Sequence, residues 1–217
     1  MTVRQFISAL AMLLSYFIAS PLSAALINPA SITATASTQL AGFNRLAIYA
    51  VNGAGLLTAT EHENFPNGFM WLSTAPGFGG LDASPYFQVD LGAVYALDNI
   101  HVWNYNEVGE IARGVNSVTV LSSTTDATLA TNINQGTTTI AIANGTDNYT
   151  GVNLLLAGNP VSFTARYIRF QINSNHGDTG PFYGLAEVQF FGVPVPEPSA
   201  FVLMLFGMCA LRVVRKR

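Results

Sequence analysis

The chain of 217 residues has one cysteine, Cys209, which falls in an apolar run near the C-terminus. The residues before that run therefore form no disulfide, no zinc–thiolate site and no cysteine nucleophile. Charged residues are also scarce, at 10% of the chain, against about 25% in an average soluble domain. This composition excludes a highly charged disordered chain.

Positive charge is nearly missing from the middle of the chain. Residues 26–197 contain four arginines and all twelve acids, a net charge of −8. Such an acidic surface repels phosphate backbones, so nucleic acid is excluded as a partner. The four arginines are Arg45, Arg113, Arg166 and Arg169.

Residues 1–25 have the layout of a secretory signal peptide. An uncharged apolar run covers residues 6–19, and Ser23 and Ala25 place small residues at positions −3 and −1 of a cut before Leu26. The alternative is an amphipathic first helix of a globular domain, but the run has no polar face. The sequence thus predicts an N-terminal signal helix and export.

Residues 194–217 have the pattern of a second targeting segment, at the C-terminus. Pro194, Pro196 and Pro198 favour an extended chain. An uncharged apolar run follows at 200–211, and the last six residues include four cations. With its flanks the run is barely long enough for a transmembrane helix, which needs about 20 apolar residues. The cations would hold its far end in the cytoplasm. A plain single-pass anchor or a buried C-terminal helix are the alternatives.

The order Pro196-Glu197-Pro198, apolar span and arginine-rich end resembles the PEP-CTERM sorting signal of Gram-negative, exopolysaccharide-producing bacteria. The resemblance implies transient insertion in the inner membrane, recognition by an exosortase and removal of the tail. The product would then stay at the cell surface or in the extracellular matrix.

Between these ends, residues 26–193 read as one β-rich domain. Short segments rich in β-branched and aromatic residues are separated by turn formers, and no window predicts an amphipathic helix. Ile168, Phe170 and Ile172 share one face of a strand, and the final strand repeats the pattern. An antiparallel β-sandwich is expected. Its predicted strands are 31–37, 86–91, 97–105, 117–123, 137–143, 166–173 and 185–191.

Seven blocks in order resemble the discoidin domain, also called the coagulation-factor type C domain, of the galactose-binding-like superfamily. The resemblance implies an eight-stranded jelly-roll sandwich with loops displayed at one end, which in most members bind sugars, lipids or proteins. The two cysteines that join the ends of many animal members are absent. The blocks are residues 52–56 (NGAGL), 70–73 (MWLS), 87–92 (FQVDLG), 102–107 (VWNYNE), 113–115 (RGV), 165–169 (ARYIR) and 184–188 (GLAEV).

Sugars are recognised by aromatic rings beside polar groups of fixed direction. Two loop segments supply these residue types and form the predicted carbohydrate site. The alternative is an internal network that pins a long loop, with Glu107 or Glu110 paired to Arg113. The predicted ligand-binding residues are Trp103, Asn104, Tyr105, Asn106, Arg113, His176, Asp178 and Tyr183.

The discoidin resemblance also implies one structural calcium ion between the loop at 52–55 and an acid of the final strand. Asn52 and Glu187 match those positions. Hard cations take several oxygen ligands, and an asparagine in place of the commoner aspartate lowers the charge of the site. A salt bridge from Glu187 to Arg45 or Arg166 is the alternative.

Catalysis has little support in the sequence. No GxSxG elbow or HExxH helix accompanies the serines and histidines, and His62 and His176 lie in polar loops where histidines are usually solvated. Scattered loop acids could form a glycosidase pair, but solvating groups are the commoner case. We therefore expect an exported, non-catalytic protein that engages extracellular polysaccharide. The alternatives are a purely structural matrix protein and, less favoured, a glycoside hydrolase using two of Glu61, Glu63, Glu107, Glu110 and Asp178.

Overall fold

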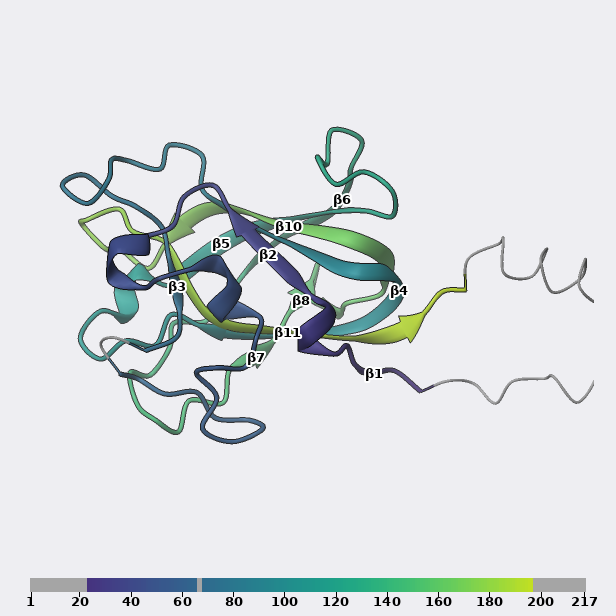
Figure 1. The fold of residues 1–217 in the computed structure, drawn as a ribbon, viewed down its shortest axis with the longest axis horizontal. Coiled ribbons are helices and arrows are strands. Elements are labelled where there is room, and N and C mark those ends of the chain that lie inside the picture. The colour runs from purple at the N-terminus through teal and green to yellow at the C-terminus, as the bar shows by residue number, and fades with distance from the viewer. Residues whose placement is uncertain (1–22, 66–67, 197–217) are drawn as a thin grey trace, which may run out of the picture.

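The computed structural model describes residues 23–65 and 68–196, in which antiparallel strands form a sandwich of two layers (Figure 1). The strands are β1 (Ala25–Leu26), β2 (Thr33–Ala36), β3 (Trp71–Leu72), β4 (Tyr86–Asn104), β5 (Val115–Ser123), β6 (Ile133–Thr139), β7 (Val152–Asn153), β8 (Leu155–Leu156), β9 (Asn159–Pro160), β10 (Phe163–Asn175) and β11 (Gly184–Pro194). The described residues also form four 3-10 helices: η1 (Pro29–Ser31), η2 (Ala41–Phe43), η3 (Ala47–Ala50) and η4 (Ile111–Arg113).

These elements confirm the predicted all-β antiparallel sandwich. Over 23–65 and 68–196, no helix is long and apolar enough to cross a bilayer. The predicted signal helix and C-terminal transmembrane helix lie outside the described residues, as do Glu197 and Pro198 of the sorting motif, whereas Pro196 is the last described residue.

Strand β4 belongs to both layers. Its first half pairs with β2 and β10, which continues to β5 and β6, while its second half pairs with β11 and β7. The sequence predicts two strands here, 86–91 and 97–105, and the structure joins them into one. Gly92, at φ 81°, turns the chain between the halves. A glycine at such a φ bends a strand without ending it.

The core lies between the layers and follows the predicted alternation. Ile168, Phe170 and Ile172 are at most 4% exposed and Val188 and Phe190 at most 1%. Because side chains alternate across a strand, the residues between them face outward on each layer. The predicted alternation fails at Ala186, because a bulge between Leu185 and Glu187 places Leu185 in this core and Ala186 in a separate buried cluster. The bounds of one predicted strand were wrong: a strand was expected at 137–143, whereas β6 covers Ile133–Thr139. Ile140 lies just beyond the end of β6, and its side chain is buried in the core.

The long connections gather at one end of the sandwich, at the left in Figure 1. A second buried cluster lies there, which includes Met70, Trp103, Tyr105 and Tyr149. The first and last described strands lie side by side, with Ala25 opposite Gly192 and Leu26 opposite Phe191. The loops therefore have their own small core at the end away from β1.

Candidate functional site

The predicted aromatic and amide block at the end of β4 is buried. Trp103, Asn104, Tyr105 and Asn106 are each at most 1% exposed. Trp103 Nε1 donates to the Thr60 carbonyl at 3.1 Å. Asn104, Tyr105 and Asn106 therefore offer no surface to a sugar, whereas Trp103, though 1% exposed, borders an open pocket on the outer face of the sheet.

The two asparagines tie loops together. Asn104 Nδ2 donates to the carbonyls of Val115 and Ala141, each at 2.8 Å. Asn106 Nδ2 donates to the Thr146 carbonyl at 2.9 Å, and its Oδ1 accepts from the Gly145 amide at 2.9 Å. Buried amides are stable only when so satisfied. Their role is to hold the loops at fixed positions, as the internal-network alternative describes.

Glu107 is the centre of the charged part of this network. Its carboxylate lies 2.8 Å from Arg45 Nη2, accepts the Tyr105 hydroxyl, and lies 3.9 Å from Arg113 Nη1. Arg113 also pairs with Glu110 at 2.9 Å. Burial raises the pKa of the Tyr105 hydroxyl, which therefore stays a proton donor. The pairing of Arg113 with Glu107 and Glu110 is the one that the internal-network alternative predicts.

The other predicted residues lie nearer the surface. The Arg113 guanidinium lies over the Phe182 ring, 4.8 Å from its centre. Asp178 Oδ2 accepts the Phe182 amide at 3.1 Å, and His176 Nε2 lies 2.9 Å from the Ile140 carbonyl. Tyr183 is half-buried against the core. The structure thus brings together Arg113 and the late loop, with Phe182 between them.

An aromatic ridge continues from Phe182 across the loop end. Its ring centre is 5.6 Å from that of Phe78, which is 5.8 Å from that of Phe43. Phe43 and Phe78 are 55% and 46% exposed and line an open loop-end pocket of about 550 Å³, between residues 39–43 and 74–79. The ridge was not among the sites predicted from the sequence, although two phenylalanines within glycine-containing loops were a visible signal.

The acids considered for hydrolysis are used locally. Glu61 accepts from the Thr58 hydroxyl at 3.2 Å, and Glu63 from the Phe69 amide at 2.9 Å. His62, expected in a solvated loop, is instead fully buried, and burial lowers the pKa of its imidazole. Over the described ranges, no three or more His, Cys, Asp and Glu side chains cluster as metal ligands.

The predicted calcium position is a buried carboxylate beneath a loop. Glu187 is 0% exposed, and its two oxygens accept the Gly53 amide at 3.2 and 3.1 Å. Burial raises the pKa of this carboxyl to about 8. Arg45 and Arg166 pair with Glu107 and Asp90 respectively. A cation would supply the missing positive charge, so Glu187 fits the predicted ion.

Asn52 fits the ion less well. Its side chain is exposed, and its Oδ1 accepts the Ala54 amide at 3.0 Å. Ca²⁺ takes six to eight oxygens, so a site here would need backbone carbonyls of the loop at 52–55 in addition to Glu187. One carboxylate and carbonyl oxygens are a donor set that suits calcium rather than zinc.

The geometry defines an all-β sandwich whose loop end is held by a buried polar network, and comparison with known proteins finds solved structures of the same fold. No protein-family model and no curated protein matches the chain. Solved structures do match the chain, and because their sequence identities are below 25%, the match shows a shared fold and nothing more.

Three of these structures illustrate the likeness. CBM32-3, a carbohydrate-binding module of a family 31 glycoside hydrolase from Clostridium perfringens, has a TM-score of 0.55 at 17% identity, covering 77% of this chain and 95% of that one. The F5/8 type C domain of a Bacteroides fragilis protein has a TM-score of 0.56 at 11% identity, covering 81% and 100%. A fucolectin from striped bass, Morone saxatilis, has a TM-score of 0.56 at 16% identity, covering 80% and 51%. The sandwich predicted from the discoidin resemblance is therefore confirmed as a fold.

Proposed function

We propose that this protein is an exported, non-catalytic carbohydrate-binding protein whose loop end binds extracellular polysaccharide. The observation that carries the proposal is the exposed ridge of Phe43 and Phe78 beside an open pocket, on a fold shared with a carbohydrate-binding module and a lectin. Aromatic rings beside fixed polar groups are suited to the apolar faces of sugar rings.

Within this proposal the predicted residues have two different roles. Trp103, Asn104, Tyr105 and Asn106 hold the loops in place from inside. Near the surface, a ligand at the ridge would meet the polar groups of η4 and of the late loop next to the aromatic rings. Those groups come from Arg113, His176, Asp178 and Tyr183.

Binding of the full chain to a glycan array and to the host's own extracellular polysaccharide tests the function. We expect saturable binding that Phe43→Ala combined with Phe78→Ala weakens at least tenfold, because the exposed rings are lost. Ile133→Ala is the matched control, since Ile133 is an apolar side chain on β6 that is at least as exposed as either phenylalanine. An array without any signal, together with no retention of host polysaccharide, overturns the proposal and favours the purely structural matrix role.

Hydrolysis is the competing activity, because carbohydrate-binding modules occur in hydrolase chains such as that of the Clostridium perfringens enzyme. Incubation with the host polysaccharide, followed by a reducing-sugar assay, separates the two. Release of reducing ends by the purified chain contradicts a non-catalytic role.

We also propose the route by which the protein reaches its ligand. A signal peptide at 1–25 directs export, the segment at 194–217 is inserted transiently in the inner membrane, and an exosortase removes it. One calcium ion at Glu187 and the loop at 52–55 would brace the domain outside the cell. The support is the order of proline motif, apolar run and basic end, together with the buried carboxylate.

A further inference from the structure

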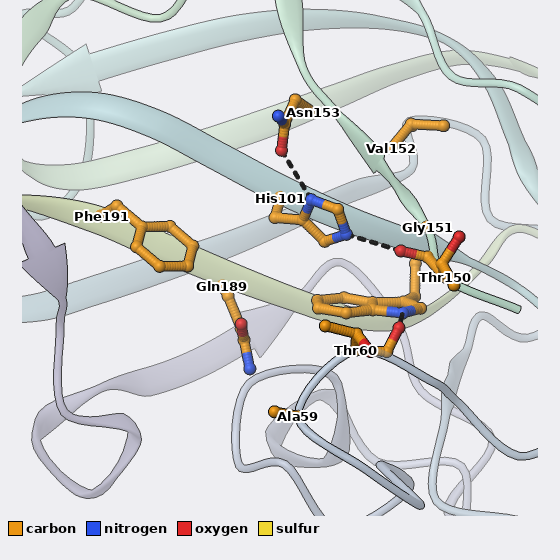
Figure 2. Close-up of a pocket in the computed structure, with 10 residues that line it drawn as sticks. Ala59, Thr60, His101, Thr150, Gly151, Val152, Asn153, Gln189 and Phe191 are labelled. Atoms are coloured by element: carbon orange, nitrogen blue, oxygen red, sulfur yellow. Dashed lines mark hydrogen bonds between the residues drawn. The ribbon is translucent and has the colours of Figure 1, made fainter.

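A second pocket lies away from the loop-end pocket, on the outer face of the layer formed by β11, β4 and β7 (Figure 2). This sheet-face pocket has a volume of about 590 Å³, within the range of about 300–1,000 Å³ that small-molecule sites have. Its side chains come from three strands and from the loop that carries Ala59 and Thr60. The strand residues are His101, Trp103, Val152, Asn153, Gln189 and Phe191.

Strand alternation explains why these residues face outward. Val188 and Phe190 lie in the core between the layers, so Gln189 and Phe191 lie on the opposite face of β11. The register pairs Gln189 with His101 of β4, and His101 with Asn153 of β7. Three neighbouring strands thus contribute one row of side chains to the pocket floor.

The pocket is held rigidly by hydrogen bonds. His101 Nδ1 lies 2.6 Å from Asn153 Oδ1, and Nε2 lies 2.8 Å from the Thr150 carbonyl, as the dashed lines in Figure 2 show. The imidazole packs edge-on against Trp103, with ring centres 4.2 Å apart. Trp103 in turn fixes the opposite wall through its bond to the Thr60 carbonyl. A pre-formed site loses little entropy when a ligand binds.

Two groups in this rigid frame are available to a ligand. The Gln189 side-chain amide, half-buried, forms no hydrogen bond with any residue in 23–65 or 68–196. The Phe191 ring is partly exposed at the pocket edge, and Figure 2 shows it beside Gln189. An apolar ring next to a free amide donor and acceptor matches a sugar ring with one apolar face and hydroxyl edges.

The charge of the pocket narrows the ligand class. None of its ten lining residues is Asp, Glu, Lys or Arg, and the domain around it is acidic. A uronate or sulfated sugar would find no lysine or arginine here, and both ring nitrogens of His101 are already used by Asn153 and the Thr150 carbonyl. The pocket is also open at the surface, so a sugar inside a longer chain can enter without a free chain end.

We propose that the sheet-face pocket is a second glycan site, which binds a neutral pyranose unit within a polysaccharide chain. The ligand class rests on the proposed function, whereas the site is distinct from the loop end. With two sites on different surfaces, one molecule would bridge two polysaccharide chains and cross-link the matrix.

Titration of the full chain with cellohexaose, mannohexaose, maltohexaose and the host polysaccharide tests this site. The readout is tryptophan fluorescence, because Trp103 lines the pocket and the chain has one other tryptophan, Trp71, in the core. We expect at least one probe to give a saturable change. Gln189→Ala and Phe191→Ala should each weaken that binding at least tenfold.

Two further variants keep the outcomes separate. Gln171→Ala, a half-buried glutamine on β10 of the other layer, is the matched control for Gln189 and should bind as wild type does. Equal dissociation constants for wild type, Gln189→Ala and Phe191→Ala overturn the second site. If binding in that case is lost in the double variant Phe43→Ala, Phe78→Ala, the sugar binds at the loop end and only the proposed function is supported. If no probe binds to any of the proteins, both proposals fail. Melting temperatures within a few degrees of wild type show that each variant is folded.

Discussion

Glu187 is a costly residue at its position, because an ionised carboxylate in an apolar interior loses its hydration. It is 0% exposed, and the Gly53 amide donates to both of its oxygens. The carboxyl has two ways to reduce that cost: it stays protonated, as its raised pKa of about 8 indicates, or it binds a cation. The protonated and the cation-bound states predict different responses of the stability to EDTA and to pH.

Removal of calcium distinguishes them. If the ion is bound, EDTA lowers the melting temperature of the wild-type chain, and Glu187→Gln lowers it to a similar value that no longer responds to EDTA. Differential scanning calorimetry measures both, and elemental analysis counts the metal. An unchanged melting temperature with no bound calcium removes the ion and leaves a protonated carboxyl.

The pH dependence of stability follows from the same residue. In EDTA the folded pKa of Glu187 is about 8, above the unfolded value, so the folded state holds the proton more tightly. Its stabilising contribution is complete below the unfolded pKa and is lost as pH rises through 8. Urea unfolding should show a fall of about 1–2 kcal/mol between pH 7 and 9. Glu187→Gln should remove this fall, and an equal slope in both proteins would contradict it.

At the scale of elements, the loop end depends on one buried ion-pair network. Arg45 is 3% exposed and its guanidinium donates to Glu107 and, at 2.5 Å, to the Gly68 carbonyl. The segment before η4 and the loop that reaches β3 are thereby joined. Arg45 lies two residues after Phe43, so this ion pair also holds the loop that carries Phe43, one end of the aromatic ridge.

Breaking this network should lower the free energy of unfolding substantially. Glu107→Gln removes the negative charge that pairs with the buried Arg45, and breaking a buried ion pair typically costs about 3–5 kcal/mol. Glu110→Gln is the matched control, because Glu110 pairs with Arg113 with its own side chain 41% exposed, and exposed pairs contribute about 0–1 kcal/mol. Chemical denaturation compares the two, and equal losses would show that the Arg45 pair is not the main contact.

The segment before β7 forms a wall of the sheet-face pocket, and Gly151 sets how closely it approaches β4. Its φ is 67°, and a Cβ added there would lie 2.6 Å from the Val102 carbonyl oxygen and 2.8 Å from His101 Nε2. Close packing at this position therefore requires glycine.

Gly151→Ala should destabilise the fold and displace the pocket wall. We expect a loss of about 1–3 kcal/mol from overpacking, beyond that of Gly158→Ala, together with weaker binding at the sheet-face pocket. Gly158 is the control, since its φ is 78° but an added Cβ meets nothing within 4 Å. Calorimetry and the hexasaccharide titration measure both effects; similar stability of the two variants would contradict close packing at Gly151.

On the scale of the whole molecule, the two ends of the domain meet. Ala25 lies opposite Gly192, and Val195 donates to the Val94 carbonyl at 2.9 Å. The two predicted membrane-directed segments, 1–25 and 194–217, therefore join the domain at adjacent points, away from the loop end. A cut after Ala25 would leave Leu26 paired with Phe191, so the mature N-terminus would remain attached to β11.

Processing in the host is the corresponding prediction. Mass spectrometry of the protein from the surface or extracellular fraction should find Leu26 as the first residue and should not find Arg217. In a strain without its exosortase, the uncut C-terminus should remain with the inner membrane. An intact chain from Met1 to Arg217 in the cytosolic fraction would contradict both export and sorting.

The sequence predicted the sandwich well where one face of a strand is buried. Ile168, Phe170 and Ile172 follow a strict alternation, which reflects a local rule. The same alternation predicts that Gln189 and Phe191 face outward on β11. It does not predict which residues of other segments surround them. The block at 102–107 has the residue types of a sugar site, and those types are equally those of a buried hydrogen-bond network.

The amino-acid sequence by itself determined the β class, the acidic, thiol-free domain and the two apolar ends, because composition and periodicity depend only on neighbours along the chain. Tertiary structure alone decided which polar residues are buried braces and which line a pocket. Asn104 and Gln189 both carry side-chain amides on strands, yet the Asn104 amide is bonded to the carbonyls of Val115 in β5 and Ala141 in a loop, whereas the Gln189 amide faces an open pocket. That difference comes from contacts between segments far apart in the sequence, which no local pattern encodes.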